Sequence, residues 1–176
     1  MSPAEAGRYL GGKKMTRQRD LAREAALEEK LTAAIREIFV EKIPFNHVLG
    51  LGVVSLHHAK PVIRFEMREQ LVGNFLRGNL HGGVIASVLD VTGGLVAFLN
   101  LQQKLKDEPM EARIERFGRL GTIDMRVDFL RPGLGSWFEA TGYPLRTGKK
   151  VAVTRMELHN DAGDMVAVGT GAYMVA

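Results

Sequence analysis

One stretch of the sequence, residues 73–100, places a lone carboxylate in an apolar run shortly after two consecutive glycines. Asp90 is the only ionisable residue between Gly82 and Leu99. The run is long enough for a helix, and apolar residues cover most of its circumference, which is typical of a buried helix. Because Asp90 stands in such a helix, we expect it to lie in the interior. A buried carboxylate costs several kcal/mol unless it is compensated, so we also expect Asp90 to serve a function there.

The start of this predicted helix could stabilise negative charge. Gly82 and Gly83 leave backbone N–H groups bare where a helix has unpaired amides and the positive end of its dipole. Such amides suit an oxyanion hole for a carbonyl oxygen. Asp90, two turns later, could act as base or nucleophile on the same carbonyl, and Asn74 could orient it or hold a water. The structural alternative is a glycine-rich helix start with a satisfied buried aspartate.

Several runs of residues together resemble one known family. His81-Gly82-Gly83, with Asp90 nine positions after the histidine, is similar to the signature of the hotdog-fold PaaI-type acyl-CoA thioesterases. The resemblance extends from about Ile43 to the C-terminus and is closest to the YigI-type bacterial thioesterases. Further matching runs are Ile43-Pro44-Phe45-Asn46, Leu80 to Ser87, Gly121-Thr122-Ile123-Asp124, Leu130-Arg131-Pro132-Gly133 and Lys150-Val151-Ala152-Val153.

The resemblance implies both a fold and an assembly. It implies an α+β hotdog fold, in which an antiparallel sheet wraps around one long central helix. It also implies a homodimer with shared active sites, or a dimer of such dimers. The substrate would be an acyl-CoA of medium or long chain length, and no cofactor or metal would be required.

The resemblance also assigns roles to site residues. The Gly83 N–H, helped by Asn74 or the loop around His81, would stabilise the oxyanion, and Gly82 would contact substrate. Asp90 would deprotonate a water or attack directly. Thr122 matches a Ser or Thr that helps to hold the water and that comes from the partner chain in similar dimers.

Two of these assignments have alternatives. Asn79 could replace Asn74. His81 could act through its ring or only through the shape of the turn.

The turn over residues 146–150 resembles the segment that meets the CoA nucleotide in related dimers. Arg146, Lys149 and Lys150 suit phosphate electrostatically, and Gly148 shapes the turn. The alternative is a solvated hairpin tip. The acyl chain is expected to lie against residues of the central helix and the N-terminal helix, such as Leu95, Phe98 and Leu99.

Two other function classes stay open. A hotdog hydratase or dehydratase would use His81 with Asp90 on an acyl thioester. A non-catalytic acyl-CoA sensor would bind the same ligand without turnover. Release of CoA thiol distinguishes hydrolysis from both.

Composition sets further limits. A length of 176 residues predicts one domain with a sizeable core. The absence of cysteine excludes disulfides and a thiolate nucleophile, and it fits a reducing, cytoplasmic location. The formal charge of +4 favours anionic ligands such as a CoA phosphate. Residues 1–16 are predicted to be a mobile basic tail; the alternative is an arm that binds nucleic acid, which we do not favour.

The remaining pattern predicts a single domain over residues 17–176. Residues 17–42 form an amphipathic helix that Pro44 ends, and a loop follows over 45–51. Strands are expected at 52–58, 61–67, 122–130, 136–146, 151–159 and 165–175. Because no helices separate the last four strands, they should pair antiparallel. The charged connection 101–120 is expected to hold a short helix at 108–117 and to be a solvated excursion for most of its charges.

Three local patterns complete the expectations. In the strand over 122–130, Ile123 and Met125 should face one way and Thr122 and Asp124 the other. The 18 residues from Gly82 to Leu99 are near the minimum for a membrane span, but the included glycines and Asp90 favour a core helix without membrane insertion. The pair at 57–58, both histidines, should point to opposite faces of a strand, which argues against shared metal binding.

Overall fold

The structure, a computed structural model, describes residue 19, residues 22–23 and residues 25–176. The basic tail predicted for residues 1–16 lies outside these residues, as do the first positions of the predicted N-terminal helix. The described part of that helix is α-helical over residues 25–37 and continues as a π-helix, Ile38–Lys42.

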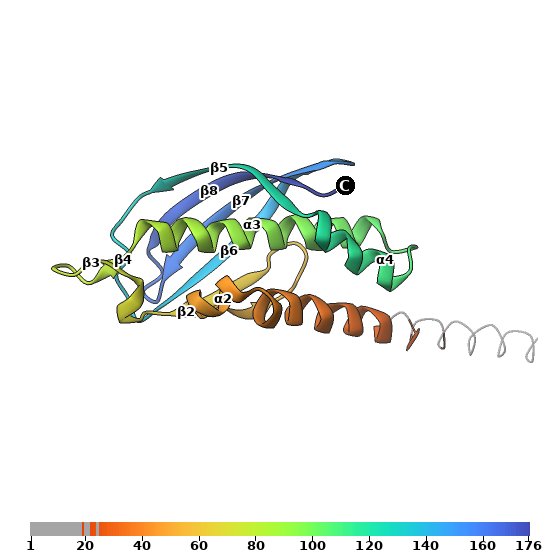
Figure 1. The fold of residues 1–176 in the computed structure, drawn as a ribbon, viewed down its shortest axis with the longest axis horizontal. Coiled ribbons are helices and arrows are strands. Elements are labelled where there is room, and N and C mark those ends of the chain that lie inside the picture. The colour runs from red at the N-terminus through yellow and green to blue at the C-terminus, as the bar shows by residue number, and fades with distance from the viewer. Residues whose placement is uncertain (1–18, 20–21, 24) are drawn as a thin grey trace, which may run out of the picture.

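Six antiparallel strands form one sheet that curves along a long helix (Figure 1). The strands are β1 (Gly52–Ser55), β2 (Val62–Glu66), β5 (Gly121–Phe129), β6 (Trp137–Thr147), β7 (Val151–Asn160) and β8 (Met165–Met174). Their order is β1-β2-β6-β7-β8-β5, and every neighbouring pair is antiparallel. The α+β architecture expected from the sequence is therefore confirmed, and within the described residues β5 is an edge strand that pairs only with β8.

The long helix α3 (Gly82–Lys104) is the core of the molecule. It packs on β5, β6, β7 and β8, and Val88, Leu89, Leu95 and Phe98 are completely or almost completely buried. Burial of each such side chain contributes about 1.5–3 kcal/mol. Among the described residues α3 is the one helix long and apolar enough to cross a membrane, but 67% of its apolar window is buried inside the molecule, as a core helix requires.

Glycines allow the helix and the sheet to approach closely. A Cβ atom at Gly93 would lie 2.1 Å from the hydroxyl of Tyr173 on β8, which leaves no room for a side chain. A Cβ at Gly169 would lie 3.2 Å from the Met156 side chain on β7 but only in ordinary contact with Leu89 on α3, at 3.5 Å, so the helix requires glycine at position 93 and not at position 169.

The predicted alternation of side chains in β5 is interrupted by a β-bulge. Thr122 and Asp124 pair with successive residues of β8, so Ile123 is an extra residue. A bulge changes which face the neighbouring side chains occupy. Thr122 therefore turns toward α3, on the same side as Met125, while Ile123 is 56% exposed. The prediction that Thr122 lies opposite to Met125 was wrong for this reason.

The N-terminal segment packs beside α3. Leu31, Ile35, Ile38 and Phe39 are buried in the same core cluster as the α3 side chains. The predicted loop over residues 45–51 is wrong, because the helix α2 (Pro44–Leu49) begins at a proline, which is favoured at the first helical position. It ends at Gly50 in the left-handed conformation.

A small hairpin, which we did not predict from the sequence, projects from the end of the molecule opposite to the start of the described N-terminal helix (Figure 1). It consists of β3 (Val72–Asn74) and β4 (Asn79–Leu80). Phe75 and Leu76 at its tip are 87% and 81% exposed.

The connection after α3 is more than a solvated excursion. It forms α4 (Met110–Glu115) and a 3-10 turn (Arg116–Arg119), which confirms the predicted short helix. Ile114 and Phe117 pack on the core. Arg113 is 1% exposed, and its guanidinium donates to the side-chain and main-chain oxygens of Gln102 on α3, at 3.2 and 3.3 Å. The expectation of a solvated charge is therefore wrong at Arg113.

Arg113 should be the main polar link between α4 and α3. Arg113→Ala leaves a cavity and removes the donors to the buried Gln102, so we expect a loss of about 3 kcal/mol in the free energy of unfolding. Chemical denaturation monitored by circular dichroism measures this.

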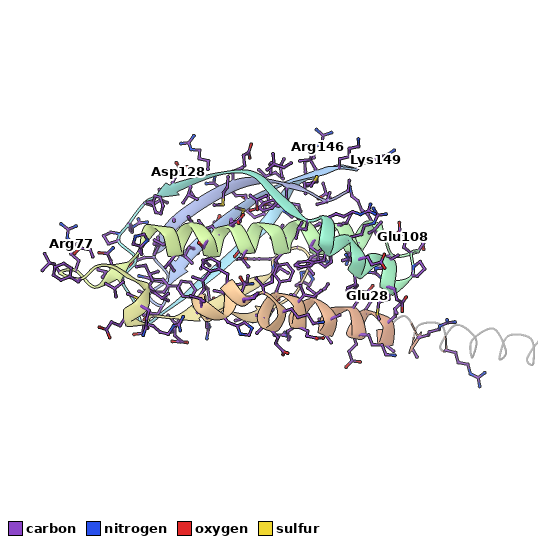
Figure 2. The ribbon with its side chains drawn as sticks, in the orientation of Figure 1. Glu28, Arg77, Glu108, Asp128, Arg146 and Lys149 are labelled. Atoms are coloured by element: carbon purple, nitrogen blue, oxygen red, sulfur yellow. The ribbon has the colours of Figure 1, made fainter. Side chains whose placement is uncertain are left out.

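The matched control is Glu28→Gln on the N-terminal helix. Glu28 lies 3.7 Å from the Arg113 guanidinium but is half exposed, and Figure 2 shows it at the surface beside the end of the molecule that carries Glu108. Its loss should stay below about 1 kcal/mol. Equal losses in the free energy of unfolding for both variants would contradict the assignment of the stabilisation to the Arg113–Gln102 contact.

Candidate active site

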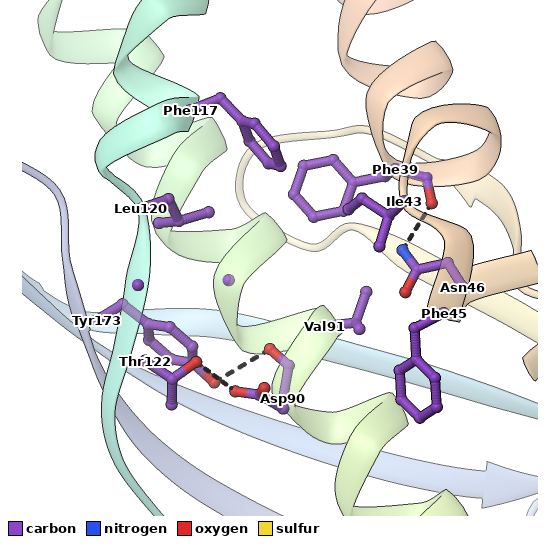
Figure 3. A pocket seen from close by; sticks show the side chains of 12 residues that line it. Phe39, Ile43, Phe45, Asn46, Asp90, Val91, Phe117, Leu120, Thr122 and Tyr173 are labelled. Atoms are coloured by element: carbon purple, nitrogen blue, oxygen red, sulfur yellow. Dashed lines mark hydrogen bonds between the residues drawn. The ribbon is translucent and has the colours of Figure 1, made fainter.

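Asp90 lies at a cavity of about 190 Å³ between α3, the start of β5 and the segment around α2 (Figure 3). The wall is mainly apolar: Phe39, Ile43, Phe45, Val91, Phe117 and Leu120. Asp90 itself is half-buried, so the expected interior position is reached only in part. The cavity places one carboxylate in surroundings that suit an apolar ligand.

Two side chains from the sheet contact Asp90. The Thr122 hydroxyl donates to Asp90 Oδ1 at 2.8 Å, and the Tyr173 phenol donates to the Asp90 main-chain carbonyl at 3.2 Å. Both contacts are drawn in Figure 3. The second carboxylate oxygen, Oδ2, has no hydrogen bond from any described residue. One oxygen is thus held and the other is free to act on a ligand.

Tyr173 is a permanently neutral neighbour of the carboxylate. Burial of the phenol, and then the nearby charge of Asp90, raise the pKa of Tyr173 far above its usual range. Across the physiological pH range it therefore remains a hydrogen-bond donor.

The sequence prediction placed Thr122 of the partner chain at the site. In the structure Thr122 of the same chain bonds to Asp90, because the bulge in β5 turns it toward α3. The hydroxyl and the carboxylate are thus brought together within one chain, and the expectation of a partner-supplied Thr122 is corrected.

His81 caps the start of α3. Its Nδ1 accepts a hydrogen bond from the Gly83 N–H at 2.9 Å. A Cβ atom at Gly83 would lie 2.9 Å from this nitrogen, so glycine makes room for the ring. The Gly83 N–H, to which we assigned the oxyanion, is therefore already occupied. Among the described residues, no hydrogen-bond partner is formed for the Gly82 N–H.

The helix start and Asp90 line different cavities. His81 and Gly83 line a second cavity of about 400 Å³, which shares only Phe45 with the cavity at Asp90. Asp90 is the seventh residue after Gly83 on α3, which places it roughly 10 Å farther along the helix axis. A single chain therefore does not bring the predicted oxyanion amides to the predicted base.

The two candidate asparagines lie in the hairpin. Asn74 is exposed, and its Oδ1 accepts from the Leu76 N–H at 3.0 Å, so it shapes the hairpin loop. Asn79 Nδ2 donates to the Leu80 carbonyl at 3.1 Å. Neither contributes to the cavity at Asp90.

The predicted nucleotide-binding residues come together at the β6–β7 turn. Arg146, Gly148, Lys149 and Lys150 line a third cavity of about 260 Å³. Figure 2 shows Arg146 and Lys149 at the surface, far from Arg77 at the hairpin tip. This cavity shares no residue with the one at Asp90.

Reasoning from sequence missed several residues of the cavity. Leu95 and Phe98, predicted to contact the acyl chain, are completely buried and lie outside its wall. Phe98 instead supports two aromatic residues of the wall, with ring centroids 6.4 Å from Phe39 and 5.6 Å from Phe117. Asn46 and Tyr173 also belong to the wall. Of these two residues, Asn46 had a signal in the sequence, since it stands in one of the runs that carried the resemblance, whereas Tyr173 had none.

No cluster of three metal-binding side chains occurs within the part of the chain that the structure describes. The argument against shared binding by His57 and His58 was nevertheless wrong in its geometry. Both lie beyond the end of β1, and their rings stack at 4.8 Å.

These features define a class of protein. A sequence profile of the thioesterase superfamily matches residues 77–167, and the sheet wrapped along one long helix is the hotdog fold. The chain belongs to the thioesterase superfamily.

Its relatives narrow the class further. The medium/long-chain acyl-CoA thioesterase YigI of Salmonella typhimurium is 43% identical over 150 residues, which cover 84% of this chain and 95% of that protein. YigI of Escherichia coli K12 is 41% identical with the same coverage. The crystal structure of a Shewanella oneidensis protein related to the thioesterase superfamily has a TM-score of 0.81 and 44% identity, over 86% of this chain and 98% of that one. The resemblance to YigI-type thioesterases is thus confirmed.

The capping role of His81 can be separated from a chemical role of its ring. His81→Ala removes the acceptor for the Gly83 N–H and should lower the free energy of unfolding by about 1 kcal/mol. His81→Asn restores a preferred N-cap acceptor and should keep both stability and thiol release close to those of the wild type. Denaturation curves and an acyl-CoA thiol-release assay measure the two properties. A stable Asn variant without turnover would contradict a purely capping role.

Proposed function

We propose that the protein hydrolyses medium- to long-chain acyl-CoA to a free fatty acid and CoA. The observation that carries the proposal is the Asp90–Thr122 pair at the edge of an apolar cavity. Membership of the thioesterase superfamily and the identity to YigI proteins support the same substrate class.

In the proposed mechanism Asp90 is the general base. The Thr122 hydroxyl donates to Asp90 Oδ1 and so orients the carboxylate. The lone pairs of the hydroxyl oxygen are free to accept a hydrogen bond from a water. Asp90 Oδ2 takes a proton from that water as its oxygen attacks the thioester carbonyl. The tetrahedral intermediate then expels the CoA thiolate, which takes the proton back from Asp90, so that the products are the carboxylic acid and free CoA thiol and the carboxylate is restored. Direct attack by Asp90 is the alternative that uses the same geometry.

The oxyanion donor in this proposal is the Gly82 N–H rather than that of Gly83. Gly82 is the first residue of α3, where amides lack partners within the helix. The Gly83 N–H is already bonded to His81.

A second copy of the chain would supply this donor. Thr122, which contacts Asp90, lies near one end of the edge strand β5, and Phe129, which lies against Gly82, is at its other end. Antiparallel pairing of two β5 strands about Met125 sets Thr122 of one chain beside the Phe129 end of the other. Asp90 of one chain and Gly82 of the partner subunit would then meet. Exposed Ile123 and Phe129 on this edge support such pairing.

The basic turn would bind the CoA nucleotide. Arg146, Lys149 and Lys150 project from a single hairpin, and Lys104 of α3 donates to the Thr147 carbonyl beside them. Four cations in one place suit the phosphates of CoA.

The hydratase alternative would need the His81 ring beside Asp90. Within one chain these two residues line different cavities, so this alternative needs the same pairing of chains, and it also needs the ring whose Nδ1 already caps the helix. Formation of an enoyl product, monitored by its absorbance, would favour this alternative over hydrolysis.

Substitution of Asp90 and Thr122 tests the chemical step. Asp90→Asn should lower kcat for thiol release by roughly 10²–10⁴-fold while the protein stays folded. Thr122→Ala should lower it by roughly 10–100-fold through loss of carboxylate orientation, with little change in KM, and Thr122→Ser should restore most of the rate. A panel of saturated acyl-CoAs of increasing length gives the chain preference in the same assay. Unchanged turnover in Asp90→Asn would reject the proposed role.

Gly82→Pro tests the oxyanion donor. Proline removes the N–H but fits the first helical position, and His81 before it already has the extended conformation that a following proline requires. We expect kcat to fall by about 10²–10³-fold. Gly82→Ala keeps the N–H, and its Cβ would only touch Phe129 at 3.5 Å, so it should stay near wild-type activity.

Mixing the two inactive variants tests the shared site. Random exchange of Asp90→Asn and Gly82→Pro subunits should restore about a quarter of the wild-type sites, because half of the dimers are mixed and each has one intact site. No recovery after refolding the variants together would place both groups in one chain.

A further inference from the structure

Asn46 is a buried amide in the wall of the cavity at Asp90. Its side chain is 1% exposed, and Nδ2 donates to the Phe39 carbonyl at 2.7 Å. Its Oδ1 is the only buried side-chain nitrogen or oxygen without a hydrogen bond among the described residues. A desolvated acceptor without a donor is unfavourable, so such groups are rare in folded proteins and call for an explanation.

The local fold accounts for only one end of this amide. The π-helix Ile38–Lys42 includes Phe39, and Asn46 Nδ2 satisfies the carbonyl of that residue. In Figure 3 the amide oxygen points away from this carbonyl and toward the side on which Val91 lies. A structural asparagine satisfies both ends of its amide with protein groups or ordered water. Within the described part of the chain the oxygen has no protein donor, so a donor group on an occupant of the cavity that Asn46 lines would satisfy it.

The surroundings restrict the chemistry of that occupant. Beside Asn46 the wall carries Phe39, Ile43, Phe45 and Val91, and the hydroxyls of Thr122 and Tyr173 both donate to Asp90. The pantetheine arm of CoA, with several amides, would leave most of its polar groups unpaired in this wall. An acyl chain with a single polar substituent fits it better. Because an amide oxygen only accepts, the substituent must be a donor, and a hydroxyl is the smallest uncharged donor that an acyl chain can carry.

We propose that Asn46 Oδ1 accepts a hydrogen bond from a hydroxyl group on the acyl chain, so that the enzyme prefers hydroxyacyl-CoA to unsubstituted acyl-CoA of the same length. This inference rests on the proposed thioesterase function and adds a specificity-determining residue to it. A site built to bond a hydroxyl discriminates strongly against the analogue that lacks it, whereas an apolar pocket does so only weakly.

The test compares decanoyl-CoA with its hydroxylated isomers, with the hydroxyl at successive positions from C2 to C6. For the wild type we expect at least one isomer to exceed decanoyl-CoA in kcat/KM. In Asn46→Leu the ratio of that isomer to decanoyl-CoA should fall by about tenfold, the value expected for one neutral hydrogen bond. A general loss of folded protein changes both rates by the same factor and leaves this ratio unchanged.

Val91→Ala is the matched control, because Val91 lines the same cavity but offers no hydrogen bond. It should alter turnover of both substrates to a similar extent. A second measurement uses the Asp90→Asn background, in which calorimetric binding of the two CoA esters gives the same ratio without turnover.

The outcomes are distinct. A ratio that Asn46→Leu leaves unchanged at every hydroxyl position overturns the proposal and assigns the oxygen to a water. Failure of the wild type to release thiol from any acyl-CoA rejects the proposed function instead. In that case the binding ratio in the Asp90→Asn protein still decides whether Asn46 recognises the hydroxyl.

Discussion

The close contact between α3 and the inner face of the sheet is the constraint on which the structure depends. The helix is apolar on most sides, so the sheet must curve along it and the N-terminal helix must cover it further. Glycine at position 93 lets the Tyr173 ring reach the helix backbone, and there the phenol bonds to the Asp90 carbonyl. The tight packing that gives the domain its core thus also fixes the helix turn that carries the carboxylate.

The edge strand β5 supplies the residues that connect this packing to the candidate site. Its bulge turns Thr122 inward to Asp90, while its other end carries Phe129 against the start of α3. β5 therefore contacts both the proposed base, Asp90, and the proposed oxyanion donor, Gly82. Within a single chain these two groups lie apart along α3. This arrangement explains why a carboxylate and an amide donor that are distant within the chain could act on one carbonyl in a pair of chains.

The sequence predicted the main elements because their signals are local. The apolar run of α3, the alternation in β2 and the turn before β7 each depend on neighbouring residues, and all three were placed within a few positions. The side to which Thr122 points was missed because a bulge depends on pairing with β8, which alternation does not encode. The capping of Gly83 by His81 and the unsatisfied oxygen of Asn46 were missed for a similar reason: they depend on atom positions, not on residue types.

Among the described residues one edge of β5 has no partner strand, and pairing of two chains along it would affect the behaviour of the protein in dilute solution. An open row of backbone donors and acceptors flanked by Ile123 and Phe129 is a template for strand addition. Self-association would satisfy it, and mass action then links the population of competent molecules to total concentration. In such an enzyme the specific activity per chain rises with protein concentration as the fraction of paired chains rises. A rate measured at nanomolar protein then depends on the affinity between subunits as much as on the chemical step.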